Sequence, residues 1–179
     1  MKKMIDPFDY AGTICKEMKK GILMTTKVDG KVNTMTIGWG HIGIEWGKPI
    51  FVAYVRESRY THNMVEEGGE FTINVPVSDI DKKILGYCGS KSGRDTDKIG
   101  DLGLTLEEPV AVSVPGIREL PLTLECKVIY KQKQDLNAIP ADIISKYYPE
   151  AEAPVYAGET RDFHYAYYGE IVSAYIIEN

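Results

Sequence analysis

The feature that most constrains the fold is an Asp29-Gly30 pair between two runs of strand-forming residues. Residues 22–28 and residues 31–37 are both rich in β-branched and apolar side chains. An Asp-Gly pair readily adopts the positive φ angles of a two-residue hairpin turn, so this arrangement predicts an antiparallel β-hairpin.

Further strand-like patterns follow the hairpin. They lie at residues 42–44, 50–56, 70–75, 120–132 and 165–177. Residues 120–132 place apolar side chains at every second position from Leu122 to Tyr130, which predicts one buried and one polar face. A soluble chain with this many strands must protect its sheet edges, and closing the sheet does so. The sequence therefore predicts a mainly β protein, an antiparallel barrel.

The predicted helices are short and peripheral. They are expected at residues 9–20, 60–67, 80–87 and 140–148. Gly21 and Gly68-Gly69 would end the first two, and Asp79 would cap the third. Residues 88–101 combine glycine with charge and predict a structured loop rather than a helix.

Composition excludes several classes of protein. With 179 residues and 44% hydrophobic content, residues 1–179 are expected to form a single domain with a buried core. A net charge of −5 argues against a nucleic-acid binder. No run of about 18 apolar residues predicts a membrane span, and the amino terminus shows no secretory signal. Three cysteines without CxxC spacing (Cys15, Cys88, Cys126) suit the reducing cytoplasm.

Familiar catalytic and nucleotide motifs are absent from the sequence. It has no GxGxxG after a strand, no GxxxxGK[ST] and no GxSxG, which argues against a Rossmann domain, a P-loop and a hydrolase elbow. The histidines, His41, His62 and His164, lie far apart and outside any HExxH pattern. No metal site is therefore expected.

Residues 56–63 predict an anion site. They place two arginines, two hydroxyls and an imidazole between a predicted strand and a predicted helix. The first turn of a helix offers backbone N–H groups and the positive end of its dipole, and arginine binds phosphate oxygens in pairs. The alternative is an ordinary polar loop.

Several segments together resemble the flavin reductase-like, FMN-binding split-barrel family, in particular its flavoredoxin-type members. They are NTMTIGWG at 33–40, PIFVAYVR at 49–56, SRYTH at 58–62, EFTINVP at 70–76, SGRDTDK at 92–98, and His164 shortly before GEIV at 169–172. The resemblance implies a Greek-key split β-barrel with short peripheral helices. It also implies a homodimer with one FMN per protomer near the subunit interface.

The resemblance assigns the phosphate side of the cofactor to two groups of residues. The first is Arg56, Ser58, Arg59, Thr61 and His62. The second is Gly89, Ser92, Gly93, Arg94 and Lys98, where the glycines permit close backbone approach. For the charged residues of the second group the alternative is a set of solvated surface ion pairs.

The isoalloxazine side falls, by the same resemblance, on the segment around the second strand of the hairpin. Its residues are Asn33, Met35, Thr36, Ile37, Gly38 and Trp39, with Asn74 from a later strand. Trp39 is equally compatible with the core or a dimer interface. Asn74 either contacts the cofactor or satisfies neighbouring backbone groups.

His164 is the catalytic candidate that the resemblance suggests. Related reductases carry Gly-Asp-His near the nicotinamide, whereas this chain has Asp162-Phe163-His164. The implied function is an oxidoreductase that accepts hydride from NAD(P)H onto FMN and passes electrons to an acceptor. For His164 the alternative is a hydrogen-bonded histidine at a strand start.

Two other functions stay open. One is an FMN-binding electron carrier reduced by a partner protein, which the altered triplet favours. The other is a flavin-free barrel used for protein interaction. Cys88 is either a redox thiol or an inert small hydrophobe.

Overall fold

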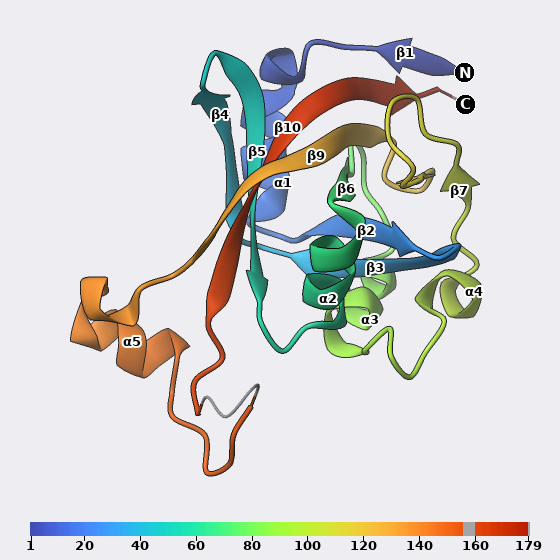
Figure 1. Ribbon diagram of the computed structural model, residues 1–179. Helices are drawn as coiled ribbons and strands as arrows, with labels where there is room; N and C mark the ends of the chain where they lie inside the picture. The colour runs from blue at the N-terminus through green and yellow to red at the C-terminus, as the bar shows by residue number, and fades with distance from the viewer. Residues whose placement is uncertain (156–159, 179) are drawn as a thin grey trace.

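The computed structural model describes residues 1–155 and 160–178, and its main feature is one antiparallel sheet (Figure 1). The strand order is β3-β2-β6-β9-β10-β5-β4, and β1 pairs with β10. These strands are β1 (Lys2–Met4), β2 (Ile22–Val28), β3 (Lys31–Ile37), β4 (Gly40–Glu45), β5 (Lys48–Arg56), β6 (Glu70–Val75), β9 (Leu122–Lys133) and β10 (His164–Ile177). A separate pair is formed by β7 (Leu106–Glu107) and β8 (Gly116–Ile117). The predicted mainly β, antiparallel fold is confirmed.

The predicted hairpin is confirmed as β2 and β3. Val28 pairs with Lys31 across the turn. Asp29 and Gly30 have φ angles of 49° and 80°, the left-handed conformation that this turn requires. The hairpin places the side chains of β3 at the floor of the site described below.

The helices are short, as predicted, but several of their boundaries differ from the prediction, and one α-helix was not predicted. The structure has η1 (Pro7–Tyr10), α1 (Ala11–Met18), α2 (Tyr60–Gly68), α3 (Lys82–Ser90), α4 (Lys98–Leu102), η2 (Leu136–Ala138) and α5 (Ala141–Tyr147). Asp81 rather than Asp79 caps α3, because its carboxylate accepts the Lys83 N–H at 2.9 Å. The prediction of a loop over residues 88–101 was wrong: Asp97 caps α4 by accepting the Gly100 N–H.

The alternation predicted for β9 does not hold: in the second half of the strand only Val128 is partly buried, and Tyr130 is 43% exposed. Residues 122–126 are buried on both faces, and these include Thr123 and Glu125. The Glu125 carboxylate accepts the N–H groups of Val110 and Ala111 at 2.7 and 2.6 Å. A covering loop that satisfies this carboxylate therefore buries the face that was predicted to be polar.

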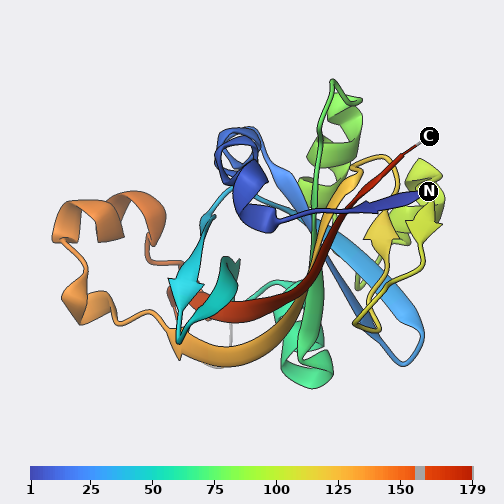
Figure 2. The same cartoon turned by 90° about the horizontal axis from the view of Figure 1, so that it is seen from above.

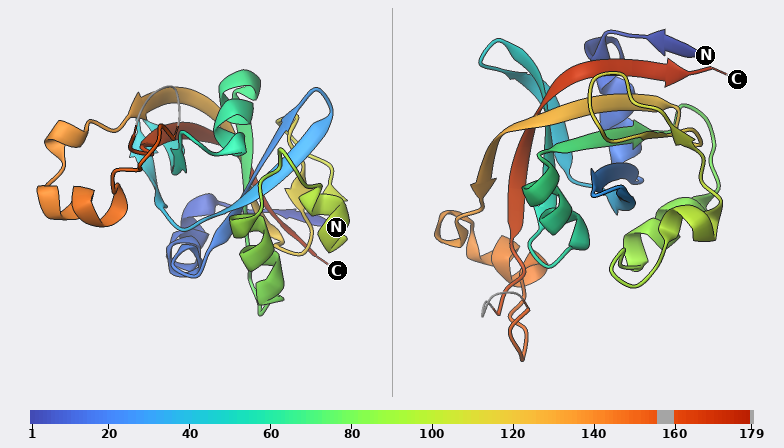
Figure 3. Two further views of the ribbon diagram at one scale, coloured as in Figure 1. Left: turned by 90° about the horizontal axis from the view of Figure 1, so that it is seen from below. Right: turned by 45° about the vertical axis from the view of Figure 1, so that its right-hand side comes forward.

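The main core lies inside the curved sheet, around Phe51, Phe71 and Tyr167. Helices α2, α3 and α4 lie at one end of it, away from the termini (Figures 1 and 3). The segment with η2 and α5 is here called the arm (residues 134–155 and 160–163), and its two helices project to one side of the sheet (Figure 2). Within the described residues, no helix combines the length and apolar character needed to cross a membrane.

Candidate functional site

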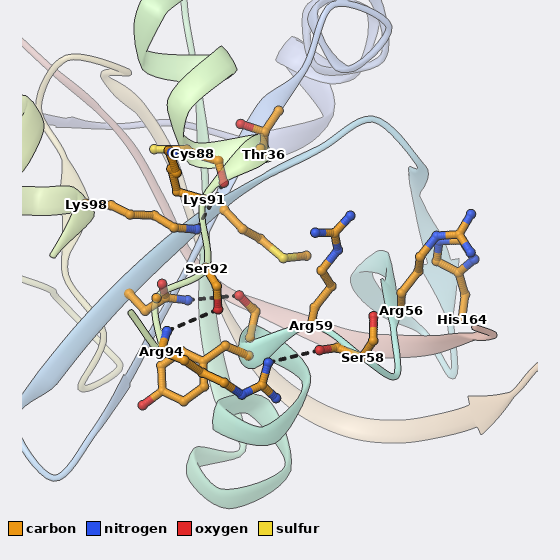
Figure 4. Close-up of a pocket in the computed structure, with 16 residues that line it drawn as sticks. Thr36, Arg56, Ser58, Arg59, Cys88, Lys91, Ser92, Arg94, Lys98 and His164 are labelled. Carbon is orange, nitrogen blue, oxygen red and sulfur yellow. Dashed lines mark hydrogen bonds between the residues drawn. The ribbon is translucent and has the colours of Figure 1, made fainter. Parts of the chain in front are cut away.

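A pocket of about 230 Å³ lies where β5 runs into α2, opposite the end of α3 (Figure 4). Residues from four separated parts of the chain line it. They are Asn33, Met35, Thr36, Arg56, Ser58, Arg59, Tyr60, Thr61, Cys88, Gly89, Lys91, Ser92, Gly93, Arg94, Lys98 and His164. Most of the residues named from the sequence are thus brought together.

Two cations in this pocket have no side-chain partner in the part of the chain that the structure describes. The side chains of Arg59 and Lys91 make no hydrogen bond or ion pair with any residue in the described ranges. Arg59 is also the N-cap of α2, and no side chain caps that helix start. Figure 4 shows the Arg59 side chain extending into the pocket. Positive charge and an uncapped helix start together favour an anion here.

Arg94 has a different role from Arg59. It donates to the Ser58 carbonyl at 3.0 Å and to Asn63 Oδ1 at 3.4 Å. Its guanidinium also lies 5.4 Å from the centre of the Tyr60 ring, and Lys31 Nζ lies 4.7 Å from the same ring. Arg94 therefore fastens the 92–98 loop to the start of α2.

Asn33 and Thr61 form a buried pair beside the pocket. Asn33 Nδ2 donates to Thr61 Oγ1 at 2.9 Å, and the two side chains are 3% and 1% exposed. Because Thr61 Oγ1 accepts this bond, its own proton remains available to a ligand. Asn33 Oδ1 has no partner among the described residues, and a Cβ added to Gly93 would lie 2.0 Å from it. Only glycine fits at that position.

Lys98 is a buried ammonium at the pocket wall. It is 4% exposed and donates to the Thr34 and Cys88 carbonyls at 2.9 and 3.0 Å. Burial lowers its pKa, and burial raises the pKa of the Cys88 thiol to about 11. Cys88 is therefore a neutral thiol near pH 7, which disfavours the redox alternative.

Arg56 and Ser58 line the pocket, but their hydrogen bonds hold the arm. Arg56 donates to the Asp162 carbonyl at 2.7 Å and to the Tyr147 carbonyl at 2.9 Å. The Ser58 N–H and hydroxyl donate to the Asp162 carboxylate at 3.0 and 2.6 Å. These donors are committed to the protein, unlike those of Arg59.

His164 begins β10 at the edge of the pocket. Its Nδ1 lies 2.8 Å from the Tyr148 hydroxyl, and its ring lies 4.7 Å from that of Trp39. Burial, followed by the charge of Arg56, lowers its pKa to about 4. The imidazole is therefore neutral near pH 7.

Five residues expected at the cofactor do not line the pocket: Ile37, Gly38, Trp39, His62 and Asn74. Ile37 belongs to the main core, and Gly38 follows it at the end of β3. The Trp39 ring packs against the His164 ring, and its centre lies 5.3 Å from the centre of the Tyr147 ring.

The side chains of His62 and Asn74 face away from the pocket, contrary to the prediction. His62 Nδ1 lies 2.6 Å from the Tyr167 hydroxyl, on the side of α2 that packs against β10. Asn74 is fully buried and bonds to the hydroxyls of Thr25 and Thr123. Neither the cofactor nor backbone groups satisfy Asn74, because hydroxyls on the two neighbouring strands do so.

Three pocket residues were not named as cofactor ligands: Tyr60, Cys88 and Lys91. Lys91 adjoins Ser92 in a loop that was predicted to bind an anion. Its positive charge could therefore have identified it as a ligand. Tyr60 lies within the SRYTH segment, but nothing in that segment shows that two cations would flank its ring.

Comparisons with known proteins identify the family and the fold. The Flavin reductase like domain matches residues 18–179. Flavoredoxin from Methanosarcina acetivorans is 28% identical with a TM-score of 0.63, covering 88% of this chain and 68% of that chain. A split-barrel protein from Shewanella frigidimarina NCIMB 400 shares the fold, with a TM-score of 0.65 at 18% identity over 98% of this chain and 76% of that chain.

A protein of Archaeoglobus fulgidus is 35% identical over 99 residues, which is 55% of each chain. The matches to curated relatives thus span about half of their length. The suspected family and the split-barrel fold are both confirmed.

Proposed function

Because the chain belongs to the flavin reductase-like family, we propose that its pocket holds FMN and serves a flavin-dependent oxidoreductase. We propose NAD(P)H as the source of reducing equivalents, which pass to an acceptor. The observation that carries this proposal is a pair of cations, Arg59 and Lys91, which have no partner among the described residues and lie beside the uncapped start of α2.

The residues of the pocket fit the phosphate end of FMN. A phosphate monoester carries about −1.5 to −2 charges near neutral pH. Arg59 and Lys91 supply positive charge, Thr61 supplies a hydroxyl donor, and the first turn of α2 supplies backbone N–H groups. Lys98, buried nearby without a carboxylate partner among the described residues, adds to the positive potential.

The rest of the pocket fits a flat ring with polar edges. Met35 gives an apolar surface, Thr36 lies beside it on β3, and Gly89 leaves room for the main chain to approach. When bound, FMN supplies the ring that takes up and gives away electrons. The residues of the chain bind and orient that ring, and no nucleophile is needed from them.

One titration tests the proposal. Purified protein is mixed with FMN, and then with NADH or NADPH under anaerobic conditions while the flavin absorbance is followed. We expect tight binding of FMN and loss of the oxidised-flavin absorbance with at least one nucleotide. Failure to bind FMN would refute the assignment of the pocket.

An electron carrier reduced by a partner protein is the second candidate, and Asp162 favours it. The carboxylate of Asp162 is bound by Ser58 at the position where related reductases have a different residue. If FMN binds but stays oxidised with both nucleotides, and dithionite then reduces it, the carrier function is supported.

We propose that two copies of the chain pair through the face of β10 that begins at His164. Tyr168 lies on this face, its ring centre is 5.0 Å from that of Tyr130, and the Tyr130 ring centre is 6.0 Å from that of Trp46. Ile44 and Trp46 are 72% and 59% exposed on the neighbouring hairpin. An exposed apolar surface of this kind is typical of an interface.

Sedimentation tests this pairing. We expect a dimer for the wild type, a monomer for Trp46→Asp and a dimer for Met4→Asp, because Met4 is exposed on β1. A monomeric wild-type protein would refute the pairing, and a dimeric Trp46→Asp variant would refute this face.

We also propose that the protein works in the cytoplasm. Cys15, Cys88 and Cys126 are free thiols in the structure, which suits a reducing compartment. Labelling of all three by a thiol reagent after unfolding, without reductant, is the expected result.

A further inference from the structure

We propose that Tyr148 and Gln134 are positioning residues that hold His164 as its Nδ1–H tautomer. In this form the Nε2 atom of His164 is a hydrogen-bond acceptor at the edge of the pocket. One part of this inference rests on the proposed function, namely the identity of the group that His164 recognises. That group is an N–H donor on the electron donor, such as the primary amide of a nicotinamide.

The Tyr148 hydroxyl has one proton and two polar neighbours within hydrogen-bond distance. The Tyr148 hydroxyl lies 2.7 Å from Gln134 Oε1 and 2.8 Å from His164 Nδ1. An amide oxygen can only accept a hydrogen bond, so the Tyr148 proton goes to Gln134. The short distance to Nδ1 is then a hydrogen bond only if Nδ1 carries the proton and donates to Tyr148.

The backbone fixes Gln134 in this arrangement. Its N–H donates to the His164 carbonyl at 3.1 Å, where β9 gives way to the arm beside the start of β10. Tyr148 comes from the middle of the arm, directly after α5, and is 3% exposed. Gln134 and Tyr148 thus connect the start and the middle of the arm to His164 at the edge of the pocket.

The surroundings keep His164 neutral. The charged groups that act on it are Arg56, Asp162 and Arg59, and two of these three are positive. The Arg56 guanidinium also lies 5.3 Å from the Tyr148 ring centre, on the strand paired with His164. An imidazolium would be desolvated beside cations, so His164 does not serve as a proton donor near pH 7.

The Nε2 atom is left with a lone pair and no hydrogen-bond partner in the described part of the chain. His164 lines the pocket, and the Trp39 ring supports it from the side. A neutral acceptor matches an amide N–H and mismatches a carboxylate. This chemistry distinguishes nicotinamide from nicotinic acid.

The tautomer is tested by NMR on protein labelled with 15N-histidine, with His164→Gln used to assign the signal. We expect the Nδ1–H form in the wild type and in Gln134→Glu, which keeps an oxygen acceptor. Gln134→Leu releases the Tyr148 proton toward Nδ1, so the Nε2–H form should replace the first. Tyr147→Phe is the matched control, and it should leave the signal unchanged.

Two results would overturn the positioning role. One is a wild-type His164 in the Nε2–H form. The other is a Gln134→Leu variant with the wild-type tautomer. Both measurements are made without nicotinamide, so failure of NAD(P)H to reduce the flavin would refute the proposed function without altering them.

The recognition step has its own test. We expect nicotinamide mononucleotide to shift the His164 Nε2 signal of the FMN-loaded protein and nicotinic acid mononucleotide to leave it in place. We also expect Tyr148→Phe to raise KM for the nucleotide by roughly tenfold, about the effect of one hydrogen bond, with a smaller change in kcat. Equal shifts with both nucleotides, or no shift with either, would show that Nε2 does not recognise the amide.

Discussion

Arg59→Ala should weaken FMN binding without weakening the fold. The Arg59 side chain has no partner within the described residues, so its removal should change the free energy of unfolding by less than about 0.5 kcal/mol. A charge-assisted hydrogen bond to phosphate contributes about 1.5–3 kcal/mol. At about 1.4 kcal/mol for each factor of ten, FMN affinity should fall roughly 10- to 150-fold.

Riboflavin provides the decisive comparison, because it differs from FMN only by the phosphate. Titration of both flavins against both proteins gives the ratio of the two dissociation constants. We expect Arg59→Ala to reduce the preference for FMN by the factor above and to leave riboflavin binding unchanged. If the preference stays at its wild-type value, Arg59 does not contact the phosphate.

Arg94→Ala is the matched control. This arginine donates to the Ser58 carbonyl and lies over the Tyr60 ring, so its loss should destabilise the fold by about 1–2 kcal/mol. FMN and riboflavin should then weaken together, since the pocket itself loosens. A selective loss of FMN affinity in Arg94→Ala would contradict the division of roles between the two arginines.

Two further predictions concern stability. Gly93→Ala places a methyl group 2.0 Å from Asn33 Oδ1 and should cost about 1–3 kcal/mol of unfolding free energy, whereas Gly43→Ala, with no atom within 4 Å, should be nearly neutral. Equal melting temperatures for these two variants would contradict this reading. His164 should make the fold sensitive to acid: its pKa is about 4 when folded and 6.5 ordinarily, so the unfolded chain binds the proton more readily. Stability should therefore fall as pH drops from 6.5, by about 3 kcal/mol at pH 4, and His164→Gln should show a weaker dependence in urea unfolding.

The local structure of the chain was largely predictable because its signals are local. The Asp29-Gly30 pair fixes a turn whatever surrounds it, and the structure has strands at the predicted residues on both sides. Helix α2 likewise ends at a glycine, Gly69, with a φ of 66°. The loop prediction at residues 88–101 failed because a capping aspartate and five more residues suffice for a short helix, and the glycine and charged residues there are equally typical of a loop.

Burial of polar groups was not predictable from one strand alone. Asn74 looked like a ligand because a polar residue in an apolar strand needs a partner. Its partners are the hydroxyls of Thr25 and Thr123 on the two neighbouring strands. Their proximity to Asn74 can be predicted only when the order of the strands in the sheet is known. Glu125 is similar, since the loop that satisfies it lies 14 and 15 residues earlier in the chain.

The roles of the two arginines show where sequence reasoning ends. Arg59 and Arg94 are the same residue type, and both lie in segments that resemble a phosphate site. The two residues differ in whether a backbone carbonyl lies within hydrogen-bond distance of the guanidinium group. The Ser58 carbonyl is turned toward Arg94 because Asp162 holds Ser58 through its N–H and hydroxyl. The arm thus decides which cation is left for the ligand, although it contributes little of the pocket wall itself. Loss of the Asp162 carboxylate should therefore weaken flavin binding, because it releases Ser58 and with it the carbonyl that holds Arg94.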